Sequence, residues 1–441
     1  MGISNGFSLI LICILGALFT FNGCSPRDNA SRLVQDCNAE SVEYQGWSAF
    51  KLSNGIVTLT IVPDIGGRVM EFNLGGHPLF YVNPAEFGKL YAQPETEAER
   101  VWHNYGGYKT WPAPQSRWGG PPDPPGSLLD GGKYTGRITQ KAGHVAEVEV
   151  VSPEDEVIGI QFIRRTKIQK GTTHVLAHQT MVNISDKPVT WSIWDVTQVP
   201  AKLTADEDFS KQAWIYFPLN PNSIHEKGYR LLDGEPVNPE WHPNVVPGIM
   251  GVQFHFIKGK VGSDNNGGWI AYVDQVHNYA YVKRFKFHPE AEYPDGGCAS
   301  EVWCDYQLPY MEVEVLSPLK ELAPGESYSF DVDWYSARCP GPIVDANELG
   351  VVNQPLEADV TDDTVNVTGV FGVFYSGNAS VIFKTAENRV LYTSDVIPVE
   401  PNHIFLLDKR FNLPAKTSVI EIEVRDVEGK KLGVLAKVTV S

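Results

Sequence analysis

Short runs in which apolar and polar residues alternate recur along most of the chain. "VAEVEVV" (145–151) and "MEVEVL" (311–316) alternate clearly, and "VTLTIV" (57–62) has the same character. A period of two is the pattern of a β-strand with one buried face. Aromatic and β-branched runs such as "VTWSIWDVTQV" (189–199) are also of strand type. No segment shows a long helical period, so the chain is predicted to be all-β.

Turn residues divide this strand-rich chain into two predicted domains. Long loops rich in proline and glycine separate the strands, above all "WPAPQSRWGGPPDPPGS" (111–127), and "CPGP" (339–342) closes the larger domain. In the last stretch, "VIEIEVRD" (419–426) alternates strictly. The length of the whole stretch 345–441 fits an immunoglobulin-like sandwich. We therefore predict a large β domain over residues 41–340 and a small β-sandwich over residues 345–441.

The N-terminus has the features of an export signal. Residues 7–21, "FSLILICILGALFTF", form an uncharged apolar run too short for a membrane span. "FNGCSP" follows and resembles a bacterial lipobox with Cys24 as the lipidated residue, although Asn22 is unusual there and no basic residue precedes the run. We expect a signal peptide (1–23), a tether (24–40) and a lipid anchor that holds the protein in a bacterial membrane, the outer one. A simply cleaved signal peptide and a membrane anchor remain alternatives.

Four cysteines remain after export: Cys37, Cys298, Cys304 and Cys339. An even number in an exported protein favours two disulfides. We expect the pairs Cys298–Cys304 and Cys37–Cys339. Zinc binding is the rival interpretation, but the sequence has no C-x-x-C spacing, so no metal site is expected.

The net charge of the chain and its lack of nucleotide-binding motifs limit the classes of partner that it is expected to bind. The formal net charge is −17, which repels phosphate backbones and disfavours nucleic acid. Neither a P-loop nor a G-x-G-x-x-G motif occurs, so no cofactor is expected.

The densest group of polar and aromatic residues is "VWHNYGGYKTWPAPQ" (101–115). Aromatic platforms with a few polar groups suit a carbohydrate site. Its aromatic side chains are candidates for stacking on sugar rings: Trp102, Tyr105, Tyr108 and Trp111. Its polar side chains are candidates for hydrogen bonds: His103, Asn104, Lys109 and Gln115. The alternative is an ordered loop packed on the edge of the sandwich.

Three motifs, "GGR" (66–68), "GGYKTWPAPQ" (106–115) and "YPDGG" (293–297), carry a family resemblance. Residues 42–335 resemble the galactose mutarotase-like (aldose 1-epimerase) superfamily, within a group of exported bacterial proteins that share these motifs. The resemblance implies a two-layer antiparallel super-sandwich whose concave face holds a sugar. It also implies acid–base chemistry, with a late glutamate as base and a mid-domain histidine as acid.

These family roles map incompletely onto the sequence. Glu312 in "YMEVE" corresponds to the base, with Glu314 on the same face of the strand, about 7 Å away. The histidine is missing: Trp194 or Asp195 of "WSIWDV" stands in its place. Trp194 could stack on a sugar but cannot deliver a proton, whereas Asp195 could if burial raised its pKa. His103 is the alternative acid.

Two further residues, Arg68 and Asp295, have two interpretations each, and His77 has one. Arg68 either contacts a ligand through its guanidinium or pairs with a buried carboxylate. Asp295 either adjoins the site or serves its Asp-Gly-Gly turn, and His77 in "GGHPLF" is expected to be turn or edge packing.

The sequence thus leaves several functions open. The first is carbohydrate binding by a lipoprotein. The second is an aldose 1-epimerase-like isomerase with Glu312 as base and His103 or Asp195 as acid. Glycan cleavage by Glu312 with Asp195 is a third.

Overall fold

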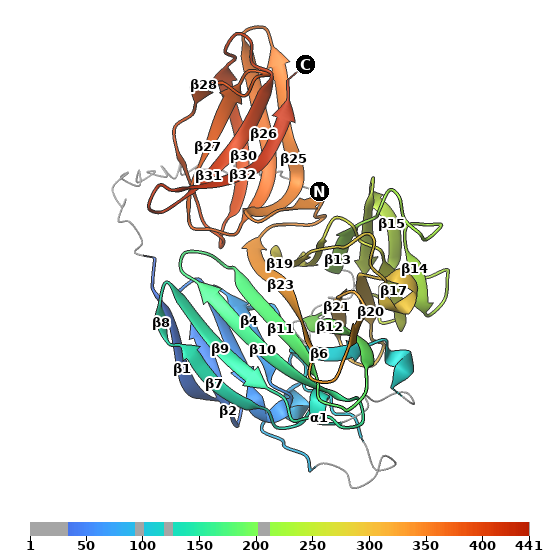
Figure 1. Ribbon diagram of the computed structural model, residues 1–441. Helices are drawn as coiled ribbons and strands as arrows, with labels where there is room; N and C mark the ends of the chain where they lie inside the picture. Colours follow the sequence, from blue (N-terminus) through green and yellow to red (C-terminus); the bar gives the residue numbers. More distant parts are fainter. Residues whose placement is uncertain (1–33, 93–100, 119–126, 202–211, 441) are drawn as a thin grey trace, which may run out of the picture. The chain divides into compact units, whose positions relative to one another are not determined.

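The computed structural model describes residues 34–92, 101–118, 127–201 and 212–440. Two large antiparallel sheets form the first domain, coloured blue to orange in Figure 1. One has 13 strands, in the order β14 (Arg230–Asp233), β17 (Gly259–Ser263), β20 (Ser300–Cys304), β21 (Tyr310–Leu316), β12 (Val189–Pro200), β6 (Tyr108–Ala113), β4 (Arg68–Leu74), β3 (Val57–Val62), β2 (Trp47–Ser53), β1 (Cys37–Tyr44) and β8 (Ala142–Gly143), with β22 (Lys320–Leu322) on β12 and β5 (His77–Pro78) on β4.

The second sheet has ten strands and packs on the first. Its order is β15 (Trp241–Val246), β16 (Ile249–Gln253), β13 (Ala213–Pro218), β18 (Trp269–Asp274), β19 (Tyr279–Phe285), β23 (Ser327–Arg338), β11 (Val175–Asn183), β10 (Ile160–Gln169), β9 (Val145–Val151) and β7 (Thr135–Gln140). Helical segments are single turns: α1 (Ser127–Asp130), α2 (Pro294–Gly297), η1 (Pro63–Ile65), η2 (Pro84–Glu86) and η4 (Gln115–Arg117). The predicted all-β, antiparallel sandwich is confirmed.

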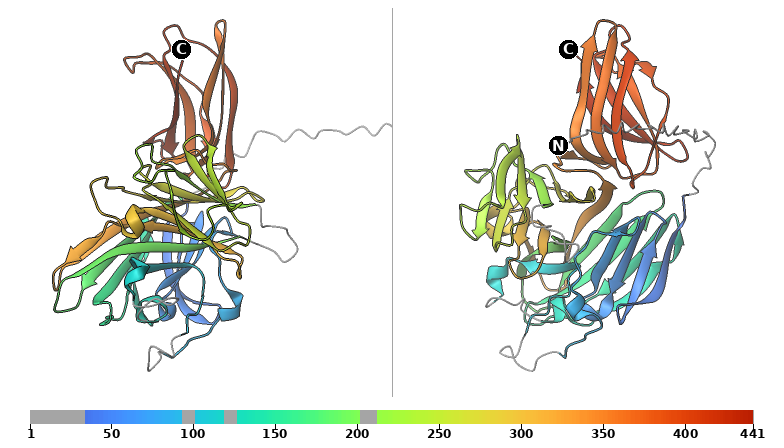
Figure 2. Two further views of the ribbon diagram at one scale, coloured as in Figure 1. Left: turned by 90° about the vertical axis from the view of Figure 1, so that its right-hand side faces the viewer. Right: turned by 180° about the vertical axis from the view of Figure 1, so that it is seen from behind.

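The C-terminal residues form a second, smaller sandwich, orange to red in Figure 1 and seen edge-on at the left of Figure 2. One sheet contains β24 (Asp345–Ala346), β25 (Gly350–Thr361), β26 (Thr364–Val373) and β30 (Ile404–Asn412). The other contains β28 (Val390–Thr393), β27 (Gly377–Lys384), β31 (Val419–Asp426), β32 (Lys431–Thr439) and β29 (Ile397–Val399). The alternating apolar residues Ile420, Ile422 and Val424 lie in its core, as their spacing predicted.

The 13-stranded sheet has an inner face, which packs on the ten-stranded sheet, and an outer face. Asp195 of β12 points inward, where its Oδ1 lies 2.5 Å from Nζ of Lys283 on β19. The side-chain amide of Gln179 on β11 donates to Oδ2 of Asp195 at 2.8 Å. Both charged groups are fully buried. The two sheets are therefore joined by an ion pair inside an otherwise aromatic and aliphatic core.

The N-terminal boundary differs from the predicted one. Strand β1 begins at Cys37, within the stretch predicted as a tether to residue 40. Cys37 and Ala39 are buried while Asn38 and Glu40 are exposed, so a polar-looking stretch still alternates as an edge strand. The predicted signal peptide and the lipidated Cys24 lie outside the described residues. Within the described ranges, no helix is long and apolar enough to cross a membrane.

The predicted disulfides are wrong. All four cysteines are free and buried. Cys298 precedes β20 and Cys304 ends it, and an extended strand rises about 3.3 Å per residue, so the two thiols are too far apart to bond. Cys37 and Cys339 belong to different core clusters. Even cysteine counts predict pairing only when the chain brings the thiols together.

Candidate functional site

Charged and aromatic side chains meet on the outer face of the 13-stranded sheet, across its adjacent strands β6, β12, β21, β20 and β17. Strand register places them on the same face, because Lys109 lies opposite Val196, Gln198 opposite Glu312, Val196 opposite Glu314 and Glu301 opposite Glu314. We call this group the polar outer face; its members are Lys109, Trp111, Trp194, Gln198, Lys260, Glu301, Glu312 and Glu314.

Glu312 is held in place by two neighbours. Nζ of Lys109 lies 3.2 Å from its Oε1, and the side-chain amide of Gln198 donates to the same oxygen at 2.9 Å. The Lys109 ammonium also lies 3.6 Å from the centroid of the Trp111 ring and 5.3 Å from that of Trp102. Burial lowers the pKa of Lys109, and the Glu312 carboxylate opposes this shift. The Glu312 carboxylate is therefore paired, held in one orientation and close to two tryptophans.

A second cluster surrounds Lys260. Its Nζ lies 2.5 Å from Oε2 of Glu301 and 2.9 Å from Oε2 of Glu314, and Trp194 donates its indole N–H to the latter oxygen at 2.8 Å. Burial raises the pKa of both glutamates; the charge of Glu314 adds to the shift of Glu301 and that of Glu312 to the shift of Glu314, although Lys260 opposes both shifts. This pair can therefore retain a proton at a pH where ordinary carboxyls are ionised.

Three oxygens of the polar outer face have neither a hydrogen-bond nor an ion-pair partner among the described residues: Oε1 of Gln198, of Glu301 and of Glu314. Buried polar atoms are nearly always hydrogen-bonded, to protein or to a bound molecule. Acceptors of this kind on one face of a sheet are what a ligand with several hydroxyl groups would satisfy.

Arg68 serves as structural support for this face and does not open onto it. Its guanidinium lies 2.5 Å from Oδ1 of Asp130 and donates to the carbonyl oxygen of Gly106 at 3.1 Å. Trp111 donates its indole N–H to the same Asp130 oxygen at 2.8 Å. The interpretation of Arg68 as a ligand contact is thus wrong, because its side chain is fully buried against the carboxylate of Asp130. Arg68 positions Trp111 through Asp130.

The glycines before Arg68 have a similar explanation. Gly66 adopts φ 79°, and a Cβ there would lie 1.8 Å from the carbonyl oxygen of Asp130. Its lack of a side chain lets the turn approach the α1 segment, rather than a ligand.

Two predicted site residues lie on the wrong face. Asp195 and Tyr108 point inward, and Asp195 is paired with Lys283 between the sheets. Alternation along β12 puts Asp195 on the opposite face from Trp194, Gln198 and, across the ladder, Glu312. The roles of Asp195 as acid or as cleavage partner and of Tyr108 as a stacking platform are therefore wrong, although burial does raise the pKa of Asp195 as required.

Two other predicted residues, His103 and Gln115, do not belong to the polar outer face. The ring of His103 lies flat against that of Tyr91, with centroids 3.4 Å apart, and within the described ranges no hydrogen bond or ion pair joins it to Glu312. Gln115 is exposed in η4. Within the face, Trp111 and Trp194 pack on each other and on Trp118, at centroid distances between 5.2 and 6.0 Å, and form one aromatic cluster.

A cavity of about 410 Å³ is lined partly by residues close in sequence to Trp111 and Trp118. Segments of two of the quoted motifs meet in its lining, which includes Pro114, Arg117, Glu292, Tyr293 and Asp295. Asp295 adopts a left-handed φ of 52°, unusual for a residue with a side chain, and its charge contributes to the raised pKa of Glu301. Asp295, which the sequence left undecided, thus lines the cavity and lies near enough to Glu301 for its charge to act on that carboxyl.

Sequence reasoning missed Glu301, Lys260, Gln198 and Asp130. Glu301 and Gln198 carry a weak signal, since each is a polar residue inside a run of apolar strand positions. Lys260 and Asp130 follow from no local pattern, because both come from segments distant in the chain.

Fold and site together define an all-β, two-sheet antiparallel sandwich with paired carboxylates, lysines and tryptophans on one sheet face. Residues 48–207, little more than a third of the chain, match the family model described as domain of unknown function (DUF4380). No protein with a curated description matches the chain.

Several solved structures are similar to this chain at low identity. A TPR-domain-containing protein from Parabacteroides distasonis matches with a TM-score of 0.48 and 14% identity, over 68% of this chain and 49% of the other. A galactose mutarotase-like protein from Clostridium acetobutylicum matches with 0.42 and 14%, over 69% and 99%. A putative aldose 1-epimerase from Escherichia coli K12 matches with 0.41 and 13%, over 68% and 99%.

Proposed function

We propose that this protein binds carbohydrate at the polar outer face and the adjoining cavity. The observation that carries the proposal is the set of three buried oxygens without partners, on Gln198, Glu301 and Glu314, next to the oriented carboxylate of Glu312. Sugar hydroxyls donate to such acceptors, and nearby indole rings suit the apolar faces of a pyranose. The motif resemblance to mutarotase-like domains supports the same ligand class.

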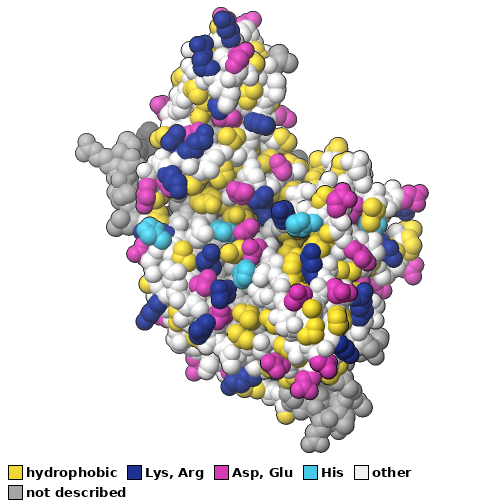
Figure 3. Space-filling view, viewed as in Figure 1, with side chains coloured by type: hydrophobic (Ala, Val, Ile, Leu, Met, Phe, Trp, Pro, Cys, Tyr) yellow, Lys and Arg dark blue, Asp and Glu magenta, His cyan; other side chains and the backbone are white. Residues whose placement is uncertain are grey.

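The cavity is suited to one or two sugar units. Its lining combines the aromatic ring of Tyr293 with the charged side chains of Arg117, Glu292 and Asp295. Charges of both signs are also interspersed over the molecular face shown in Figure 3. A mixed lining of this kind favours a neutral, hydroxyl-rich ligand.

Replacing Glu312 by glutamine is expected to weaken glycan binding by about 10- to 100-fold, the effect of losing a charge-assisted hydrogen bond. The measurement is calorimetric titration of the wild type with a glycan panel, followed by the variant with the best ligand. Glu321→Gln, on the exposed strand β22, is the matched control and should bind like the wild type. Equal affinities of Glu312→Gln and the wild type would contradict binding at Glu312. If no glycan of the panel binds to the wild type, carbohydrate binding itself is contradicted.

A second candidate is an aldose 1-epimerase-like isomerase. One observation favours it: Glu314, whose pKa burial raises, shares a face with Glu312, so a proton donor and a carboxylate base adjoin each other. Exchange spectroscopy on the sugars from the same panel decides between the two functions. Anomer exchange above the buffer rate, lost in Glu312→Gln, supports catalysis, whereas binding without exchange leaves a carbohydrate-binding protein.

We further propose that the protein is exported and anchored to the bacterial membrane through Cys24, as the lipobox-like "FNGCSP" indicates. Cells that express the full chain should incorporate labelled palmitate into the wild type and not into Cys24→Ser. Equal labelling of the two proteins would rule out this anchor.

A further inference from the structure

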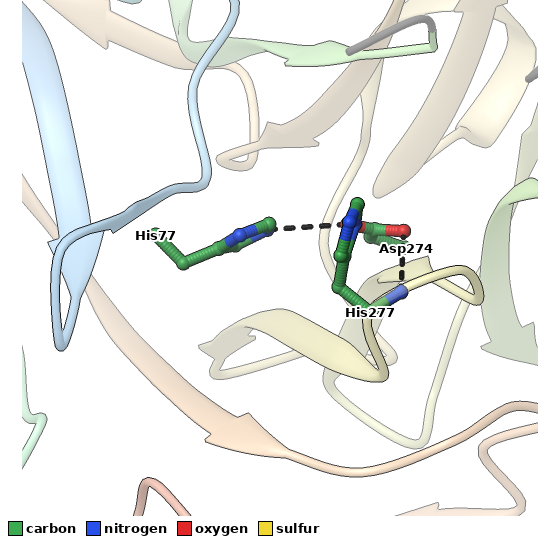
Figure 4. A group of neighbouring side chains, drawn as sticks. All are labelled: His77, Asp274 and His277. Carbon is green, nitrogen blue, oxygen red and sulfur yellow. Dashed lines mark hydrogen bonds and ion pairs between the residues drawn. The ribbon is translucent and has the colours of Figure 1, made fainter. Parts of the chain in front are cut away.

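Two histidines and an aspartate, none of them part of the polar outer face, meet at one place in the large domain. His77 comes from β5, Asp274 ends β18, and His277 lies in the turn before β19 (Figure 4). Nε2 of His77 lies 3.1 Å and Nδ1 of His277 lies 2.8 Å from the same carboxylate oxygen, Oδ2 of Asp274. One oxygen thus faces two imidazole nitrogens.

The three groups are held in these positions by their surroundings. Oδ1 of Asp274 accepts the backbone N–H groups of Val276 and His277, at 3.0 and 3.1 Å, which leaves Oδ2 directed at the imidazoles. The ring of His77 is stacked on that of Tyr279, with centroids 3.9 Å apart and planes 6° apart. Asp274 is buried, whereas His277 is partly accessible to solvent. The cluster is therefore preorganised and has an entry side.

Ligand type and spacing fit a transition-metal ion. The three ligand atoms all lie within 4.8 Å of one another, and this is the single such group of three found among the described residues. Two imidazoles and one carboxylate form a ligand set used by zinc, with bonds of about 2.0 to 2.2 Å. In three-ligand sites of this kind, water or another molecule completes the tetrahedron.

We propose that His77, Asp274 and His277 bind one zinc ion that cross-links the two sheets of the large domain. His77 belongs to the 13-stranded sheet, whereas Asp274 and His277 belong to the β18–β19 hairpin of the ten-stranded sheet. The ion joins segments almost 200 residues apart, and a link across so long a loop restricts the unfolded chain strongly. His77 is then a ligand, beyond the packing role that the sequence predicted. This site does not depend on carbohydrate binding.

Titration of the metal-stripped full chain with zinc chloride tests the proposal. Calorimetry should show one tight site per chain, and zinc should raise the melting temperature of the wild type. His277→Gln, on the hairpin, and His77→Gln, on the other sheet, should each weaken this site by at least about 10-fold, since even residues that contact metal ligands indirectly contribute that much. Circular dichroism without zinc shows whether each variant folds.

The matched control is His178→Gln. His178 also contacts an aspartate, Asp331, at 2.6 Å, but on the surface and without a second histidine. This variant should bind zinc like the wild type. No stoichiometric binding by the wild type, or equal binding by wild type and folded His277→Gln, would overturn the proposal, because zinc would then bind only at other histidines or not at all.

Discussion

Replacing Lys283 by methionine is expected to lower the free energy of unfolding by about 3 to 5 kcal/mol. The substitution leaves the Asp195 carboxylate between the two sheets without its cation, and Asp195 is fully buried. The ammonium of Lys283 also donates to the carbonyl oxygens of Asp195 and Val313, at 3.1 and 2.7 Å, and both bonds are lost. Urea denaturation of the two proteins at pH 7.5 measures the difference.

A double variant and a surface control separate the charge effect from a general loss of packing. Lys283→Met combined with Asp195→Leu removes both charges, and it should recover part of the lost stability. Lys286→Met, three positions along and exposed, should unfold like the wild type. If Lys283→Met is as stable as Lys286→Met, the buried pair does not join the sheets as the structure indicates.

Glu240 is expected to contribute a decrease of about 3 kcal/mol to the stability of the wild type between pH 4.5 and 7, at about 1.4 kcal/mol per pKa unit. Burial raises the pKa of this carboxyl from its usual 4.5 to about 7. The backbone N–H groups of His255 and Ile257 donate to it and oppose the shift. Between these values the unfolded chain has lost the proton that the folded chain keeps, so rising pH favours unfolding.

Glutamine at position 240 removes the titration and keeps an oxygen for the backbone donors. Urea denaturation between pH 4.5 and 7.5 should therefore show a smaller decrease for Glu240→Gln than for the wild type. Glu235→Gln, at an exposed position nearby, should follow the wild type. Parallel curves for the wild type and Glu240→Gln would show that Glu240 titrates normally.

Part of the candidate site could be predicted from the sequence. Lys109, Trp111, Trp194 and Glu312, all proposed from motifs, do lie on one face of adjacent strands. Asp195 was predicted to join them, but its neighbour Trp194 already occupies that face, and consecutive strand residues point to opposite faces. Since Trp194 and Asp195 are consecutive in "WSIWDV", alternation excludes one of them from the site face. It does not show which of the two is excluded.

The alternating pattern in "MEVEVL" shows a second limit. Alternation predicts one buried and one solvated face, yet every residue of β21 is buried, including Glu312 and Glu314. Glu312 and Glu314 are enclosed on their own face because Lys109, Lys260 and Trp194 of neighbouring strands contact their carboxylates. A period of two shows that the faces differ in polarity, but it does not show what covers either of them.

The sequence alone determined that this protein is all-β and antiparallel, because alternation and turn residues act over a few neighbouring positions. It also determined which short segments carry polar and aromatic chemistry. Only the tertiary structure decided that the cysteines stay unpaired, that Asp195 pairs with Lys283, and that His77 meets Asp274 and His277. Such contacts join residues tens to hundreds of positions apart, and they depend on strand order and register, which local patterns do not encode.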